Sequence, residues 1–171
     1  ISFVSPRRNF GPLADLGEGT ALFIQYTGWS PSRELNFFLG ANRARDMDDF
    51  KEALKYFDAG SQNWIYADVD GNIGYFTSAE IPLRADLAQG TVDGMVPPWI
   101  IRDGTGALNH EWLPVSTPQT GQAIPFEILP FEEMPQVVNP QWGYIANANN
   151  DPIGTTLDNN PYNQLRPGAN G

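Results

Sequence analysis

The sequence contains no cysteine and a single histidine, and both scarcities narrow its chemistry. Without cysteine there is no disulfide, no thiolate nucleophile and no cysteine-ligated zinc site. With His110 as the only histidine, a multi-histidine metal site is excluded, and a Ser-His-Asp triad could use no other residue. The polar surroundings of His110, at 108–112, predict an exposed loop.

Positive charge and long apolar runs are also scarce. The formal net charge is -10, and Lys51 and Lys55 are the lysines. This balance argues against binding a nucleic acid or an anionic membrane surface. The apolar runs fall well short of the roughly 20 residues that span a bilayer. A chain of 171 residues with 41% hydrophobic residues instead fits one folded domain, or a large piece of one.

Hydrophobic periodicity predicts an α+β fold. Residues 20–27 are rich in aromatic and β-branched side chains, as in a strand. Ser30-Pro31 is typical of a helix start. A second short helix should follow Asp46 as its N-cap and stop before Gly60.

Two alternating runs, at 63–68 and 72–77, flank Asp70-Gly71 and predict an antiparallel hairpin. The alternating oxygen-bearing side chains that begin at position 68 also resemble a calcium loop. An EF-hand loop needs its glycine at the sixth position, whereas Gly71 is at the fourth. The hairpin is therefore the favoured interpretation.

The chain divides into strand-helix-helix-hairpin at 20–81, a proline-rich loop region at 82–142, and a strand with a polar tail at 143–171. Closely spaced prolines block long helices and central strands. A loop of this length usually covers or shapes a site. Aromatic residues are expected to anchor it to the core: Trp99, Trp112, Phe126, Phe131 and Trp142.

The segment 144–152 predicts a short strand that ends in three asparagines, Asn147, Asn149 and Asn150. Asparagine at such a position can make a turn. A buried amide at a strand end can also donate to an oxyanion during acyl transfer. The residues alone leave both readings open, and they offer no phosphate-binding loop and no nucleophile elbow.

Three ordered motifs resemble those of penicillin acylases: NWIYADVDGNIGY at 63–75, LPFEEMP at 129–135, and NPQWGYIANANN at 139–150. The helical pattern of 29–57 is similar as well. The resemblance implies a piece of an αββα N-terminal nucleophile hydrolase sandwich, with 1–171 as a single internal fragment of a β subunit. Such enzymes cleave an N-acyl amide, as in penicillin or an acyl-homoserine lactone, through a serine acyl-enzyme, with the serine's own α-amino group as base.

By the same resemblance, Asn149 matches the side chain that donates to the oxyanion, while Asn147 and Asn150 are structural. Asp158 matches an aspartate that binds a structural calcium ion in the full-length enzyme, and catalysis needs no cofactor. Gly40 and Gln62 stand where some relatives have acyl-pocket residues.

In the family, the catalytic serine, the second oxyanion donor and most calcium ligands belong upstream of Ile1. The resemblance therefore implies that the fragment is inactive alone. It also implies that the fragment's partners are the remainder of the β subunit and the α subunit, in the periplasm or outside the cell. The alternative is a non-catalytic ligand-binding or structural module, in which the aromatic loop is the ligand surface.

Overall fold

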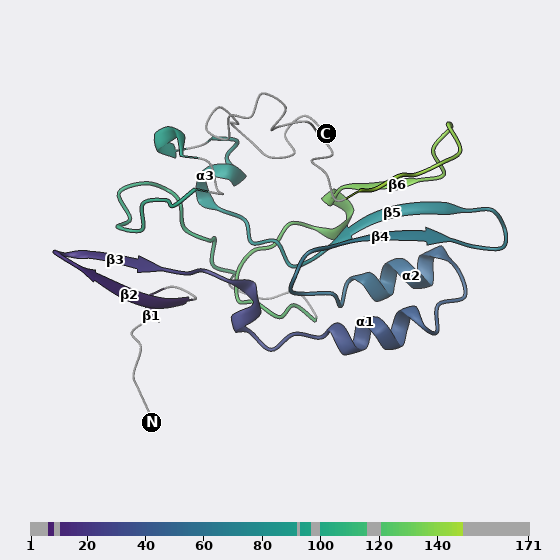
Figure 1. The fold of residues 1–171 in the computed structure, drawn as a ribbon, viewed down its shortest axis with the longest axis horizontal. Helices are drawn as coiled ribbons and strands as arrows, with labels where there is room; N and C mark the ends of the chain where they lie inside the picture. Colours follow the sequence, from purple (N-terminus) through teal and green to yellow (C-terminus); the bar gives the residue numbers. More distant parts are fainter. Residues whose placement is uncertain (1–6, 9–10, 92, 97–99, 116–120, 149–171) are drawn as a thin grey trace.

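The computed structural model describes residues 7–8, 11–91, 93–96, 100–115 and 121–148. Two three-stranded antiparallel sheets organise this part of the chain (Figure 1). The first has the order β1-β2-β3, from Arg7–Arg8, Gly11–Gly17 and Thr20–Phe23. The second has the order β4-β5-β6, from Gln62–Ala67, Ile73–Ser78 and Gln136–Val138.

The helices are short. They are α1 (Glu34–Ala41), α2 (Met47–Leu54) and α3 (Ala85–Ala88), with 3-10 turns η1 (Thr27–Trp29), η2 (Asp93–Met95) and η3 (Phe131–Glu133). None of the helices in the described ranges is long and apolar enough to cross a membrane. Figure 1 shows α1 and α2 on the same side of the β4–β5 hairpin.

The main core lies between these two helices and one face of the β4-β5-β6 sheet. Its buried side chains are Phe37, Ala53, Leu54 and Phe76. Trp64 and Tyr66 of β4 pack against them. Because side chains alternate along a strand, Ile65 and Tyr75 lie on the opposite face, where Ile65 is exposed.

Helix α2 begins as predicted. The Asp46 side chain accepts a hydrogen bond from the Asp49 backbone N–H at 2.8 Å. Asp48 and Asp49 occupy its first turn, at the positive end of the helix dipole.

Helix α1 begins later than predicted. Ser30 closes the 3-10 turn η1, and the N-cap position of α1 is Arg33. The Arg33 N–H donates to Asp58 Oδ2 at 2.7 Å, so a partner distant in sequence replaces the local cap. No pattern of neighbouring residues could show that partner.

The hairpin prediction is confirmed, with strand ends within a residue of those expected. The carboxylate of Asp68 accepts hydrogen bonds from the backbone N–H groups of Asp70 and Asn72, from the Asn72 amide and from the Tyr66 hydroxyl. These donors lower the pKa of Asp68, with the Asn72 side chain the largest influence. Asp68 therefore closes the turn. The described residues contain no group of three or more His, Cys, Asp or Glu side chains arranged to bind a metal ion.

The proline-rich region is more ordered than a single loop. It contains α3, η2, η3 and β6, and isolated bridges pair Pro82 with Ile128, Arg84 with Trp112, and Pro114 with Phe126. These bridges join residues far apart in sequence, so the local pattern of hydrophobic residues does not predict them.

The aromatic residues predicted to anchor the loop region differ in burial and packing. Trp112 is buried edge-to-face against Phe126, with ring centroids 5.1 Å apart, and Phe131 packs on the main core. The prediction for Trp142 was wrong, because this side chain is exposed, and Trp99 lies outside the described residues.

Two strand predictions need correction. The strand expected at 20–27 ends at Phe23, and residues 27–29 form η1 instead. The strand expected from Tyr144 is not formed over 144–148. The strand that pairs with β5 is instead β6, with Gly74 opposite Val138.

Candidate functional site

The end of β6 is tied to the start of β5 by Asn139. Its backbone N–H donates to Ile73 O, and its side-chain oxygen accepts from the Ile73 N–H, both at 2.9 Å. Its side-chain NH2 donates to Asn72 Oδ1 at 3.0 Å. Asn139 has φ +47°, a left-handed conformation that asparagine tolerates well. The chain therefore leaves the sheet at a fixed position.

Beyond Asn139 the chain turns, with the Gly143 N–H donating to Pro140 O at 2.9 Å. Figure 1 shows it reversing direction at the end of β6. The described part of the chain ends at Ala148. The two predicted site residues, Asn149 and Asp158, lie outside the described residues, so their roles stay predictions.

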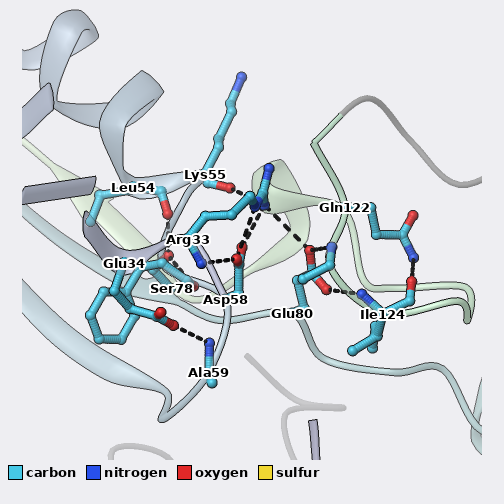
Figure 2. A network of polar contacts seen from close by, with 12 residues as sticks. Arg33, Glu34, Leu54, Lys55, Asp58, Ala59, Ser78, Glu80, Gln122 and Ile124 are labelled. Atoms are coloured by element: carbon cyan, nitrogen blue, oxygen red, sulfur yellow. Dashed lines mark hydrogen bonds and ion pairs between the residues drawn. The ribbon is translucent and has the colours of Figure 1, made fainter. Parts of the chain in front are cut away.

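A second polar site, which sequence reasoning missed, joins three segments around the Arg33 guanidinium (Figure 2). Its Nε donates to Asp58 Oδ2 at 2.9 Å and its Nη2 donates to Asp58 Oδ1 at 2.5 Å. The same Nη2 lies 3.4 Å from Glu80 Oε1. Both carboxylates are buried, and the hydrogen bond to Asp58 is the main cause of the raised pKa of Arg33.

Glu80 also holds the 121–124 segment. Its Oε1 accepts from the Ala123 N–H at 2.5 Å, and its Oε2 accepts from the Ile124 N–H at 2.8 Å. Burial nevertheless raises the pKa of Glu80 and outweighs these two donors. One cation, Arg33, serves both Glu80 and Asp58, and it gives its two shortest bonds to Asp58.

The Arg33 network borders a pocket of about 280 Å³ lined by Arg33, Lys55, Ser78, Glu80, Gln122 and Phe131, among others. Ser78 is no nucleophile in this arrangement, because its buried hydroxyl donates to Leu54 O at 2.5 Å. The charged groups satisfy one another and the backbone. The geometry is that of a clamp between α1, α2, β5 and the 121–124 segment.

The expectation that His110 lies in an exposed loop was wrong. Its side chain is buried, with Nε2 2.9 Å from Asp93 O. Next to it the fully buried Asp86 is paired with Arg102 and also accepts the Asp93 N–H. Burial would raise the pKa of Asp86, but Arg102 and the backbone donors lower it. Since backbone bonds and an ion pair organise this cluster, it reads as a small polar core.

The two residues expected in an acyl pocket, Gly40 and Gln62, do not line the same groove. Gly40 lines an open groove of about 350 Å³ with Arg43, Glu52, Ala53 and others, and a Cβ at this glycine would approach the Ala53 Cβ to 2.9 Å. Gln62 is exposed and does not line that groove.

No local sequence signal pointed to the Arg33 network. Arg33 meets Asp58 and Glu80, which are 25 and 47 residues away along the chain. Nothing local distinguishes them from solvated charges.

Comparison with known proteins agrees with the motifs. Residues 3–167 match the penicillin amidase family. The chain is 41% identical over 90 residues to penicillin G acylase of Escherichia coli, covering 53% of this chain and 8% of that protein. A solved structure of a thermostable penicillin G acylase from Alcaligenes faecalis matches with a TM-score of 0.50 and 32% identity, covering 70% of this chain and 17% of that chain.

The chain thus spans a small part of the relatives that it matches. The agreement extends from the sequence motifs to the mixed α+β arrangement of antiparallel strands and few helices. Because the family match includes nearly every residue, the chain belongs to the penicillin amidase family.

Proposed function

We propose that this chain is part of an N-terminal nucleophile amidohydrolase, which cleaves an N-acyl amide such as penicillin or an acyl-homoserine lactone through a serine acyl-enzyme. The observation that carries the proposal is the family match over residues 3–167, joined to 32% identity with a solved penicillin G acylase. The geometry of the sheet and of the Asn139 junction supports it.

The β4-β5-β6 sheet resembles one half of an αββα sandwich. Helices α1 and α2 and the core aromatics cover one face, while Ile65, Tyr75 and Val137 stand on the other. A second sheet packs at about 10 Å on such a face and buries its alternate side chains. Because the match covers 17% of the solved relative's chain, we place that second sheet in the rest of the parent enzyme.

We assign Asn149 as one donor to the oxyanion. The assignment rests on the resemblance of the motif at 139–150, whose first residue, Asn139, is held at the sheet by three hydrogen bonds. In the proposed reaction the serine hydroxyl oxygen attacks the amide carbon. The carbonyl oxygen then takes on negative charge, which the Asn149 side-chain NH2 stabilises. The serine's own α-amino group takes the hydroxyl proton and passes it to the leaving nitrogen, so that the C–N bond breaks and the amine departs. Water then hydrolyses the ester of the acyl-enzyme, which releases the acid and restores the serine hydroxyl.

The remaining assignments follow from the same proposal. Residues 1–171 form a single internal fragment of the β subunit, with the rest of that subunit and an α subunit as partners. Asp158 contributes to a structural calcium site in the full-length enzyme. The parent enzyme works in the periplasm or outside the cell, and the isolated fragment has no amidase activity because the family's serine lies upstream.

The test uses the intact encoded enzyme and a chromogenic N-acyl amide. Removing one oxyanion donor costs about 3 kcal/mol of barrier, so Asn149→Ala should lower kcat by roughly a hundredfold or more while KM changes little. Asn147→Ala is the matched control and should have a much smaller effect on kcat. Full turnover by Asn149→Ala would reject its role, and no hydrolysis of any N-acyl amide by the wild-type enzyme would reject the activity itself.

A further inference from the structure

Helices α1 and α2 lie on the same core but present different surfaces to the outside. The outward residues of α2 are charged, and Lys51 and Lys55 pair with acids one turn away. Helix α1 instead exposes large apolar side chains: Leu35 is 79% exposed, Phe38 49% and Leu39 55%. Single exposed apolar residues are ordinary, but three on one turn of one helix form a patch.

The three side chains form a continuous stripe, because residues three and four apart are neighbours on a helix. Phe37 points into the core, where it meets the Phe57 and Trp64 rings at 5.3 and 4.5 Å between centroids. Gly40 faces α2 at Ala53. At 100° per residue, the stripe of Leu35, Phe38 and Leu39 therefore lies on the flank of α1 turned away from α2.

A helix that is apolar around most of its circumference is normally buried. Helix α1 has this composition, while α2, of equal length and on the same sheet, is amphipathic. The contrast indicates that water covers the outer face of α2 and that protein covers the flank of α1.

We propose that this stripe is the docking site for an amphipathic α-helix from the parent enzyme, outside residues 1–171. The proposal rests on the proposed function, which makes the chain a piece of a longer enzyme. Backbone groups within a helix are already hydrogen-bonded to one another, so the flank of α1 cannot recruit a strand by sheet pairing. Ridges at the spacing of residues 35, 38 and 39 instead interdigitate with those of a second helix. Since the match covers 17% of the solved relative's chain, most of the parent is available to supply it.

The first test measures accessibility in the intact enzyme by cysteine labelling. The chain has no native cysteine, so a single Leu39→Cys substitution gives one identifiable site within it. The matched control is Asp48→Cys on α2, where the native side chain is 92% exposed. Leu39→Cys should react with a maleimide at least tenfold more slowly than Asp48→Cys. Equal rates in a natively assembled enzyme would overturn the proposal.

A second test needs no substitution, which guards against misfolding of the variant. Hydroxyl-radical footprinting of the wild-type enzyme should modify Leu35 and Phe38 severalfold less, after correction for intrinsic reactivity, than the fully exposed Val69 in the hairpin turn. Modification of Leu35 and Phe38 at the rate of Val69 would overturn the proposal.

The occupant is identified with a photo-crosslinking amino acid at position 35 of the intact enzyme. A cross-linked peptide from a helix outside residues 1–171 supports the proposal. A peptide from within this chain, or from a second copy of it, overturns it. An amidase assay on the same wild-type sample reports separately on the proposed function, because a protected flank and absent turnover are distinguishable results.

Discussion

Replacing Arg33 by alanine should destabilise the protein far more than replacing the surface residue Arg45. Arg33 is the shared partner of Asp58 and Glu80, whose side chains are 4% and 6% exposed. Removing one member of a buried charge pair costs about 3–5 kcal/mol, because the other charge is left without compensation. Since the Arg33 side chain is itself 21% exposed, water can reach the site, and we expect a value near the lower end, about 3 kcal/mol.

The assay is urea unfolding of the purified chain, followed by tryptophan fluorescence, to which the buried Trp112 and the core-packed Trp64 contribute among the five tryptophans. With an m-value of about 2 kcal/mol/M, the midpoint of Arg33→Ala should fall by about 1.5 M. Arg45→Ala is the control, because its ion pair with Asp49 is on the surface and its side chain is 85% exposed. Because solvent screens this exposed pair, that change should leave the unfolding midpoint almost unchanged.

Two further measurements separate the charge effect from lost packing. Burial raises the pKa of Glu80, so this carboxyl becomes neutral at a higher pH than an ordinary glutamate. The cost of Arg33→Ala should therefore shrink as the pH falls through that raised value. A double variant with Glu80→Gln should recover part of the loss. If Arg33→Ala costs no more than Arg45→Ala at neutral pH, the clamp does not stabilise the fold.

Three other outcomes follow from the same contacts. The pKa of Glu80 is raised above 4.5 in the folded state, so the folded protein loses stability as the pH rises from 4.5 through the raised pKa of this group. Glu80→Gln should remove this pH dependence of the unfolding free energy in urea. An unchanged pH profile in the variant would contradict the argument. Asp46→Ala removes the α2 N-cap and should cost about 1 kcal/mol by the same assay, whereas Asp46→Asn should cost far less. Gly40→Ala should be destabilising, because its Cβ would lie 2.9 Å from that of Ala53, and Ala53→Gly in the same chain should make the Gly40→Ala change less costly; equal costs in both backgrounds would show that the helices adjust freely.

The local elements could be predicted wherever a residue's partners are its near neighbours. Asp46 bonds three residues ahead, so the start of α2 was predictable. The hairpin at 63–77 was predictable from alternation and Asp-Gly, since its strands pair across a short turn. The family was predictable for the same reason, because its motifs are continuous runs of sequence.

Predictions failed where distant segments competed for the same position. The strand expected from Tyr144 is not formed over 144–148, and the segment that pairs with β5 is 136–138. His110 was expected to be exposed, but the chain around Asp93 covers it. Neither outcome has a local signal, because each depends on contacts between segments that are distant in sequence.

The sequence by itself determined the α+β composition, the capped helix, the hairpin and the membership of the penicillin amidase family. Only the tertiary structure decided that Arg33 joins Asp58 and Glu80, and that Asn139 fixes the exit from the sheet. The physical reason is that hydrogen bonds and ion pairs act over a few ångströms. The secondary structure of a segment depends largely on its neighbours along the chain, whereas contacts with residues distant in sequence form only when the chain folds.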